Sequence, residues 1–157
     1  MEQLKQFYAQ LPKKSFLTVA TVVLILCDVL ILGYLYFKFS NEAFFQRTLG
    51  MSMELNGLSP AHMDPELVSS LQIMFHKTLV IMLSLAAFYH VINYVCWWND
   101  KKFATTYVKF LTTIGGPLII LWGFGILSAG SNVGLLFLVM GAAVFSLKLG
   151  MNVHYKE

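Results

Sequence analysis

The chain alternates long runs of apolar residues with short polar segments. The apolar runs lie at about residues 15–38, 75–98, 107–127 and 131–149. A helix rises about 1.5 Å per residue, so about 20 residues cross the roughly 30 Å hydrocarbon core of a bilayer. The pattern therefore predicts an all-α integral membrane protein with four spanning helices. Short connections favour an up-down-up-down four-helix bundle in a single membrane domain that comprises residues 1–157.

The second run indicates one long helix with a polar seam. Asp64 is a typical N-cap residue, Pro65 suits the first helical position, and the segment from Thr78 to Trp98 has no formal charge. At about 100° per residue, one face of this helix collects both of its histidines and several other residues. The residues on this face are His76, Leu83, Ala86, His90, Asn93, Tyr94 and Trp97. We expect the seam to face other helices rather than lipid.

The first run could be mistaken for a signal peptide, because Lys13 and Lys14 precede it. It is too long for the apolar region of such a peptide, and no small-residue cleavage motif follows, so we expect an uncleaved helix.

Residues 40–69 form the sizeable loop between the first two helices. Phe44, Phe45, Leu49, Met53 and Leu55 favour a short interfacial helix there, while the alternation at residues 51–56 leaves a strand-like turn open. One arginine stands against four acidic residues in this loop, which gives it a net charge of −3. That charge could attract cations, or the loop could simply be solvated.

The third and fourth runs contain residues that shape helices. Pro117 follows Gly115 and Gly116, and it cannot donate to the carbonyl of Thr113, so a kink is expected, serving either packing or a hinge. The fourth run carries small residues at helical spacing, which allow backbones to approach closely within the chain or between copies. These small residues are Gly130, Gly134, Ala142, Ser146 and Gly150.

Composition supports a membrane protein. Hydrophobic residues make up 57% of the chain and charged residues 12%, against about a quarter charged in soluble domains. The net charge of +3 is too small to argue for nucleic acid. The sequence has no GxGxxG, Walker A, HExxH or GxSxG motif, so it signals no standard nucleotide or hydrolase site. Cys27 and Cys96 lie in separate apolar runs, where we expect small buried side chains.

The distribution of positive charge predicts the orientation. With the N-terminus in the cytoplasm, eight lysines lie on the cytoplasmic side, and two lysines and an arginine lie on the other side. Cytoplasmic segments of membrane proteins are enriched in these residues, so both termini are expected to be cytoplasmic. We expect a bacterial inner membrane, with lipid, further copies of the chain or other membrane subunits as partners.

Asp28 lies near the middle of the first span, where an acidic residue costs at least about 2.5–3.5 kcal/mol. It is therefore expected to face the bundle interior. One interpretation is a proton or cation path formed by Asp28, His90, Asn93 and Ser84. The other is a hydrogen-bonded latch, for example to Trp122, Ser84 or Tyr89.

Depth in the membrane separates the two central groups of that path. Counted from the cytoplasmic boundary, Asp28 lies about 20 Å and His90 about 12 Å into the bilayer. A direct pair would then require helix tilt or an intervening water.

His76 and His90 are 14 residues apart, close to four helical turns, so both project from one face. This spacing is similar to that of the paired axial histidines in di-haem b-type membrane bundles. The resemblance implies haem as an alternative cofactor, although no other span contains a histidine and a homodimer would have to supply the missing ligands. His62, His76 and the acidic loop have no recognisable metal-ligand spacing. We otherwise expect no cofactor or metal.

Three functions remain open from the sequence. The first is an ion- or proton-conducting subunit that uses Asp28, in a homo-oligomer or a larger membrane complex. The second is a non-catalytic accessory or assembly subunit. The third is a haem- or quinone-linked redox subunit. None of the three is favoured by an enzyme motif.

Overall fold

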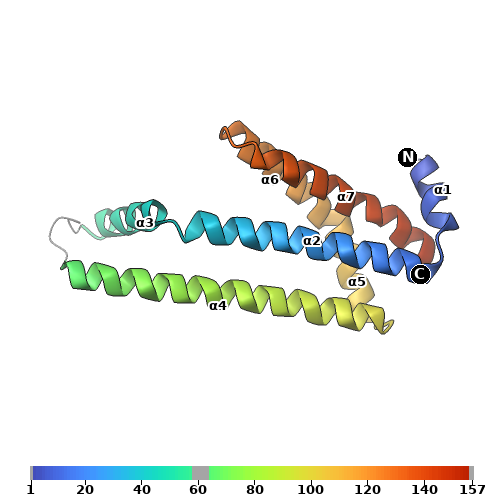
Figure 1. Ribbon diagram of the computed structural model, residues 1–157, viewed down its shortest axis with the longest axis horizontal. Coiled ribbons are helices and arrows are strands. Elements are labelled where there is room, and N and C mark those ends of the chain that lie inside the picture. Colours follow the sequence, from blue (N-terminus) through green and yellow to red (C-terminus); the bar gives the residue numbers. More distant parts are fainter. Residues whose placement is uncertain (1, 58–63, 156–157) are drawn as a thin grey trace. The chain divides into compact units, whose positions relative to one another are not determined.

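The computed structural model describes residues 2–57 and 64–155, and this part of the chain is all-α, without a strand. The elements that Figure 1 shows in order are α1 (Glu2–Gln10), α2 (Lys13–Phe39), α3 (Glu42–Leu55), α4 (Pro65–Trp98), α5 (Lys102–Phe110), the π-helical turn η2 (Leu111–Gly115), α6 (Gly116–Ser128) and α7 (Val133–His154). Because α5, η2 and α6 follow one another without a break, they form one continuous helical segment.

Four helical segments are long and apolar enough to cross a membrane, namely Lys13–Phe39, Pro65–Trp98, Lys102–Ser128 and Val133–His154. The predicted all-α class and the four apolar helices are therefore confirmed. α2 and the α5–α6 segment extend beyond their apolar runs at both ends, whereas α7 begins at Val133, after the expected 131, and continues to His154. The long helix α4 begins at Pro65, as the sequence predicts, and is capped by the Asp64 carboxylate, 3.0 Å from the amide nitrogen of Glu66.

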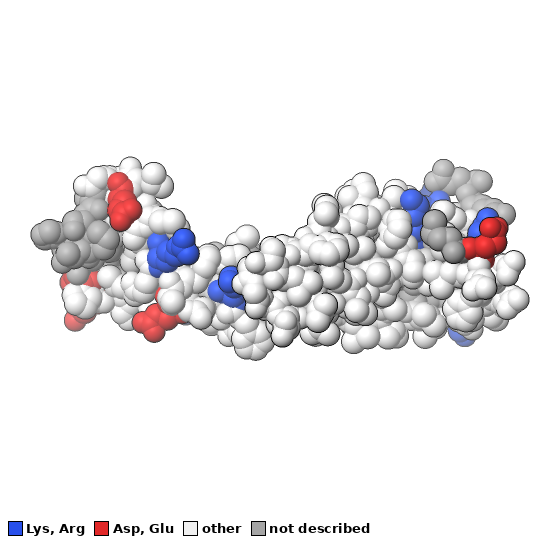
Figure 2. Space-filling model, turned by 90° about the horizontal axis from the view of Figure 1, so that it is seen from above, with Lys and Arg blue, Asp and Glu red and all other residues white. Residues whose placement is uncertain are grey.

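The chain forms two compact units, one made of residues 1–30 and 90–157 and the other of residues 31–89. On the face drawn in Figure 2, the charged side chains of the first unit lie around the ends of the chain, and those of the second lie around α3. Other residues cover the rest of the visible surface of each unit. Such a separation of charged and uncharged surface is typical of membrane proteins, whose charged side chains lie mostly near water.

The loop expected at residues 40–69 is largely helical, because α3 and the start of α4 fill most of it. Asn41 caps α3, and its side-chain oxygen accepts from the amide of Ala43 at 2.8 Å. Phe45 and Met53 are buried on one face of α3, as expected for the short helix, whereas Leu55, expected on the same face, is 88% exposed. The alternating residues 51–56 form the last turns of this helix and its C-cap rather than a strand.

α6 and α7 form a closely packed hairpin in the first unit. The turn between them uses Gly130 at a φ of 83°, and the amide of Ser131 donates to the carbonyl of Ile126 at 3.2 Å. A Cβ atom placed on Gly123 would lie 3.0 Å from the carbonyl oxygen of Gly134. On Gly116 it would lie 2.8 Å from the amide nitrogen of Phe145. The two backbones therefore touch at glycines.

The five small residues predicted to form a contact face lie in different surroundings. Gly134 packs on α6, and Gly150 is buried against the ring of Phe16. Ser146 is half-buried and bonds to the Tyr8 hydroxyl at 3.0 Å. Ala142 and Gly130 are exposed, and the neighbouring Gly141, which the pattern did not select, packs against Ile120.

The chain changes direction between α5 and α6, where the sequence predicts a kink (Figure 1). The π-helical turn ends at Gly115, so the amide of Gly116 donates to the carbonyl of Leu111, five residues earlier. This wider turn comes directly before Pro117, which has no amide hydrogen to donate. Gly116 is buried against the backbone of Phe145, so this position is held by α7.

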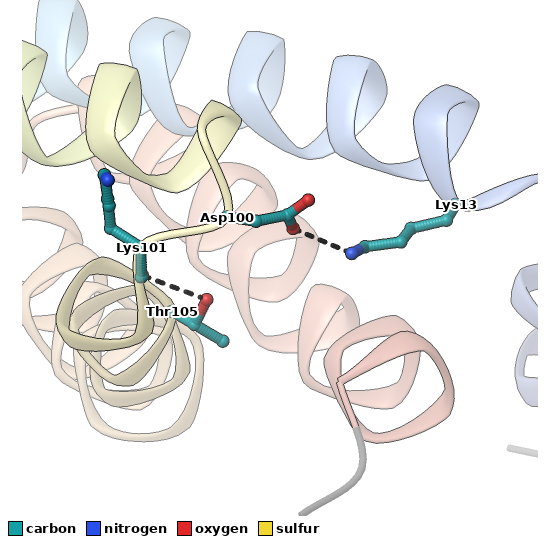
Figure 3. A network of polar contacts seen from close by, with 4 residues as sticks. All are labelled: Lys13, Asp100, Lys101 and Thr105. Carbon is teal, nitrogen blue, oxygen red and sulfur yellow. Dashed lines mark hydrogen bonds and ion pairs between the residues drawn. The ribbon is translucent and has the colours of Figure 1, made fainter.

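The ends of the first unit are fastened by polar contacts. The Lys13 ammonium lies 2.7 Å from Asp100 Oδ1, and the hydroxyl of Thr105 donates to the carbonyl of Lys101 at 3.4 Å (Figure 3). Asp100 has a φ of 53° and closes α4, since the amide of Lys101 donates to the carbonyl of Cys96 at 3.0 Å. Both charges of the Lys13–Asp100 pair are exposed, so the pair contributes little stability.

α1 packs on the last turns of α7 through Tyr8. The His154 Nε2 atom lies 2.9 Å from the carbonyl oxygen of Tyr8, and the imidazole of His154 stacks on Phe16 with ring centroids 4.9 Å apart. These contacts place the first and last helices of the chain at the same end of the first unit.

Candidate functional site

The candidate site lies within the first unit, where residues 13–30 of α2 meet residues 90–98 of α4. Polar contacts at two levels along the helices join these segments. The Trp98 indole nitrogen donates to the hydroxyl of Thr21 at 2.8 Å. Farther into the apolar part of both helices, Asp28 contacts His90 and Tyr94. The only acidic residue within the four apolar runs is therefore placed against polar partners.

Both carboxylate oxygens of Asp28 are engaged by side chains of α4. Oδ1 lies 2.9 Å from His90 Nδ1, and Oδ2 accepts from the Tyr94 hydroxyl at 2.7 Å. The Tyr94 oxygen lies 3.4 Å from the same His90 nitrogen, so the three groups form a closed triangle. Because an ionised carboxylate only accepts hydrogen bonds, Nδ1 carries the hydrogen when Asp28 is ionised.

The three groups differ in exposure. Tyr94 is 3% exposed, whereas the side chains of Asp28 and His90 are 18% and 28% exposed. The hydroxyl is therefore enclosed by protein, while the carboxylate and the imidazole retain an accessible edge. An acid and an imidazole in contact can take up one proton as a carboxylic acid or an imidazolium without any helix movement.

Aromatic rings hold the imidazole of His90 from two sides. Tyr94 lies edge-on at a centroid distance of 6.0 Å with an interplanar angle of 88°, and Tyr107 lies at 5.9 Å with an angle of 87°. Tyr107 comes from α5, so a third helix takes part in the site. This frame limits the rotation of the ring and keeps Nδ1 directed at the carboxylate.

Helical spacing explains why these residues meet. His90, Tyr94 and Trp98 follow each other at intervals of four residues on α4, and Thr21 and Asp28 are seven residues apart on α2. Both spacings are close to whole numbers of turns, so each set projects from one face. The two faces therefore contact each other at two levels, at Thr21–Trp98 and at Asp28 with His90 and Tyr94.

Asp28 and His90, which the count of residues along the helices places at different depths, contact each other directly without an intervening water. The estimate counted both helices from a common boundary. Measured from the Thr21–Trp98 contact, Asp28 is seven residues along α2 and His90 eight along α4, so both lie about 10–12 Å away. α2 begins at Lys13, before the Thr21–Trp98 contact, whereas α4 ends at Trp98. The Lys13 side chain reaches Asp100, which follows the end of α4.

The structure brings together two of the four residues predicted for the path. Asp28 and His90 form the pair, and Asn93 is buried about one turn from His90 on α4. Ser84 belongs to the second unit and is exposed.

The partners suggested for a latch lie elsewhere. The ring of Trp122 packs on Phe137 at a centroid distance of 5.1 Å, and Tyr89 belongs to the second unit and is exposed.

Tyr94 belongs to the candidate site, although the sequence did not single it out as a partner of Asp28. It was assigned only to the seam of the second span. The available signal was its position one turn after His90 on the same face. Tyr107 had no such signal, because its contact with His90 depends on how α5 folds back.

The two histidines of α4 have different surroundings. His76 lies in the second unit, edge-on to the ring of Tyr36 at 5.7 Å, while His90 pairs with Asp28. His62 lies outside the described residues. Within residues 2–57 and 64–155, no cluster of three or more His, Cys, Asp or Glu side chains is arranged to hold a metal ion.

Comparisons of this chain with known protein families, with curated proteins and with solved structures find no match.

Proposed function

We propose that this chain is a proton-conducting subunit of a bacterial inner-membrane assembly, in which Asp28, His90 and Tyr94 bind and release the proton. The assembly would be a homo-oligomer or a larger complex, because one bundle of four helices has little room for a path of its own. The observation that carries the proposal is the direct contact between an intramembrane carboxylate and an imidazole, 2.9 Å apart.

A latch alone does not need this pair. The same segments of α2 and α4 are already joined by the neutral hydrogen bond between Trp98 and Thr21. A carboxylate adds a cost of about 2.5–3.5 kcal/mol at this depth, which a second neutral bond would avoid. The partial exposure of Asp28 and His90 also suits groups that exchange a proton with their surroundings.

The proposed orientation has an up-down-up-down arrangement with both termini in the cytoplasm. It is supported by the excess of lysines in the segments that this orientation places on the cytoplasmic side. The contact of α1 with the last turns of α7 agrees with it.

The test is proton flux into sealed liposomes that contain the purified chain, a pH-sensitive dye and a potassium gradient with valinomycin. We expect flux for the native chain and its loss for Asp28→Asn, which keeps the shape of the side chain but removes its charge. Asp100→Asn is the matched control, because Asp100 is an exposed acid paired with Lys13. Size-exclusion profiles and circular dichroism must show that each variant is folded.

Flux at the level of empty liposomes for the native chain would refute conduction by a homo-oligomer of this chain, and undiminished flux for Asp28→Asn would refute the role of Asp28 in conduction. The alternative function is then an assembly subunit. It is favoured by the engagement of both Asp28 oxygens by α4, which is what a latch requires. In that case Asp28→Asn should reduce the oligomer or complex recovered in mild detergent, with no flux from either form.

A further inference from the structure

We propose that the second unit binds the phosphate headgroup of an anionic phospholipid in a cavity between the end of α2, α3 and α4. The cavity has a volume of about 300 Å³. It is lined from α2 by Phe39 and the following Ser40, from α3 by Phe45, and from α4 by a set of residues that includes His76 and Lys77. All of these residues belong to residues 31–89, so the cavity is separate from the Asp28 cluster.

The polar part of the lining consists of hydrogen-bond donors. Ser40 contributes a hydroxyl, Gln72 an amide, His76 an imidazole and Lys77 an ammonium group. Phosphate oxygens only accept hydrogen bonds, and charge-assisted bonds from an ammonium group are among the stronger ones. The lining therefore suits an anion with several acceptor oxygens.

The charges around the cavity are arranged for an anion, although the segment is acidic overall. None of the described residues that line the cavity is acidic. The acidic residues of this unit lie outside that lining, at Glu42, Glu54, Asp64 and Glu66. A cavity formed in an acidic segment by cationic and neutral donors alone favours an anionic occupant over a cation.

The apolar part of the lining favours a lipid over a free ion. The rings of Phe39, Phe45 and Phe75 form the wall, and those of Phe45 and Phe75 pack at a centroid distance of 5.7 Å. Free phosphate would leave these rings without a partner, whereas the glycerol and upper acyl carbons of a lipid would cover them. The ring of Tyr36 packs edge-on against His76 and fixes the orientation of the imidazole.

The position along the helices agrees with a headgroup site. Lys77 directly precedes the uncharged stretch that begins at Thr78, and Ser40 directly follows the last residue of α2. The cavity thus lies where both spans leave their apolar segments, which is the depth of lipid phosphates. A cavity lined by a lysine and a histidine at this depth can hold a headgroup through charge-assisted hydrogen bonds.

The test measures lipid binding to the full-length protein in a neutral detergent by native mass spectrometry. The probes are dioleoyl phosphatidylglycerol, dioleoyl phosphatidylcholine and inorganic phosphate. We expect one phosphatidylglycerol per chain, bound about tenfold more tightly than phosphatidylcholine, and no retained inorganic phosphate. Lys77→Gln should weaken phosphatidylglycerol binding about tenfold, and His76→Gln should weaken it less, because neutral imidazole contributes no full charge.

The matched control is Lys38→Gln, because Lys38 lies in the last turn of α2 but does not line the cavity. This variant should bind phosphatidylglycerol like the native chain. Equal losses for Lys77→Gln and Lys38→Gln would overturn the proposal in favour of diffuse attraction. Equal affinity for both lipids would overturn recognition of the headgroup charge. Displacement of phosphatidylglycerol by inorganic phosphate would assign the cavity to a free anion instead.

Discussion

Asp28 is held by two side chains that lie one helical turn apart on α4, and each bond can be removed separately. Tyr94→Phe deletes only the hydroxyl that donates to Oδ2 at 2.7 Å. Because hydrogen bonds to charged groups contribute about 1.5–3 kcal/mol, we expect the free energy of unfolding to fall by about that amount. The measurement is unfolding in mixed micelles titrated with SDS.

A double-mutant cycle isolates this contact from other effects of the substitution. Combined with Asp28→Asn, the Tyr94→Phe loss should be smaller than in the native background, with a coupling of about 0.5–3 kcal/mol. Combined with Asp100→Asn, which is remote from Tyr94, the losses should add. Additive losses in both cycles would show that the bond contributes no coupling.

Tyr155 predicts a pH dependence at the ends of the chain. Burial, and secondly the nearby Asp100 carboxylate, raise the pKa of Tyr155 from 10.0 to about 12. The unfolded chain therefore ionises this phenol before the folded chain does. The stability gained from keeping it neutral is complete below pH 10.0 and is lost as the pH rises to about 12.

The check is thermal unfolding of the native chain and Tyr155→Phe across this alkaline range. The variant should lose stability less steeply than the native chain between pH 10.0 and about 12. Parallel curves would mean that Tyr155 ionises equally in both states.

At the scale of single residues, Asp28 could be recognised from the sequence, but its contacts with His90 and Tyr94 could not. Asp28 stands out because a charge in an apolar run has a known cost. Tyr94 does not, since tyrosine is ordinary in membrane helices. The direct contact of His90 with Asp28 could not be predicted, because it depends on the offset between α2 and α4, which only an interhelical contact such as Thr21–Trp98 fixes.

Among the elements, the α6–α7 hairpin depends on backbone contact at its glycines. Gly123→Ala would place a methyl group 3.0 Å from the carbonyl oxygen of Gly134, and backbone cannot yield as a flexible side chain does. We expect a loss of about 1–3 kcal/mol in the free energy of unfolding, as for other overpacked sites.

Gly125→Ala is the matched control on the same helix, because nothing lies within 4 Å of its added Cβ atom. It should be neutral or slightly stabilising, since alanine favours helix by up to about 1 kcal/mol over glycine. The SDS titration described for Tyr94 measures both variants. Equal effects of the two substitutions on the free energy of unfolding would show that the close approach of Gly123 to Gly134 does not cause the loss.

The glycine contacts also show what a pattern within one helix can predict. The sequence selected small residues of the fourth span at intervals of four, which is the register of a helix seen alone. The hairpin instead joins Gly116 and Gly123 of α6 to Gly134 and Gly141 of α7, each pair seven residues apart. This register follows from the path of α6 after the π-helical turn. The kink was predictable from Pro117, but the π-helical form was not.

For the whole molecule, the main prediction is that the two termini lie on the same side of the membrane. Reporter fusions at residue 1 and residue 157 should both be active with a cytoplasmic reporter and inactive with a periplasmic one. A reporter inserted after Asn56, between α3 and α4, should show the opposite pattern. Opposite results for the two termini would exclude four spans.

At this scale, the sequence predicted the helical class and the four apolar helices, because length and hydropathy are set locally. The ends of the helices were less predictable, since hydrogen bonding continues into polar residues where capping groups permit it. The division into two units could not be predicted either, because its boundaries at residues 30/31 and 89/90 fall within the continuous helices α2 and α4. Such a division depends on contacts between segments and not on the local pattern.

The length of α4 has a consequence for reagents applied from the aqueous phase. Its 34 residues measure about 51 Å along the axis, about 20 Å more than the hydrocarbon layer is thick. Since the uncharged stretch reaches Trp98 at one end, the surplus falls mainly on the residues after Pro65. About two turns of α4, before the residues that line the lipid cavity, should therefore stand clear of the lipid, where a protease could reach them once any outer cell layers have been removed.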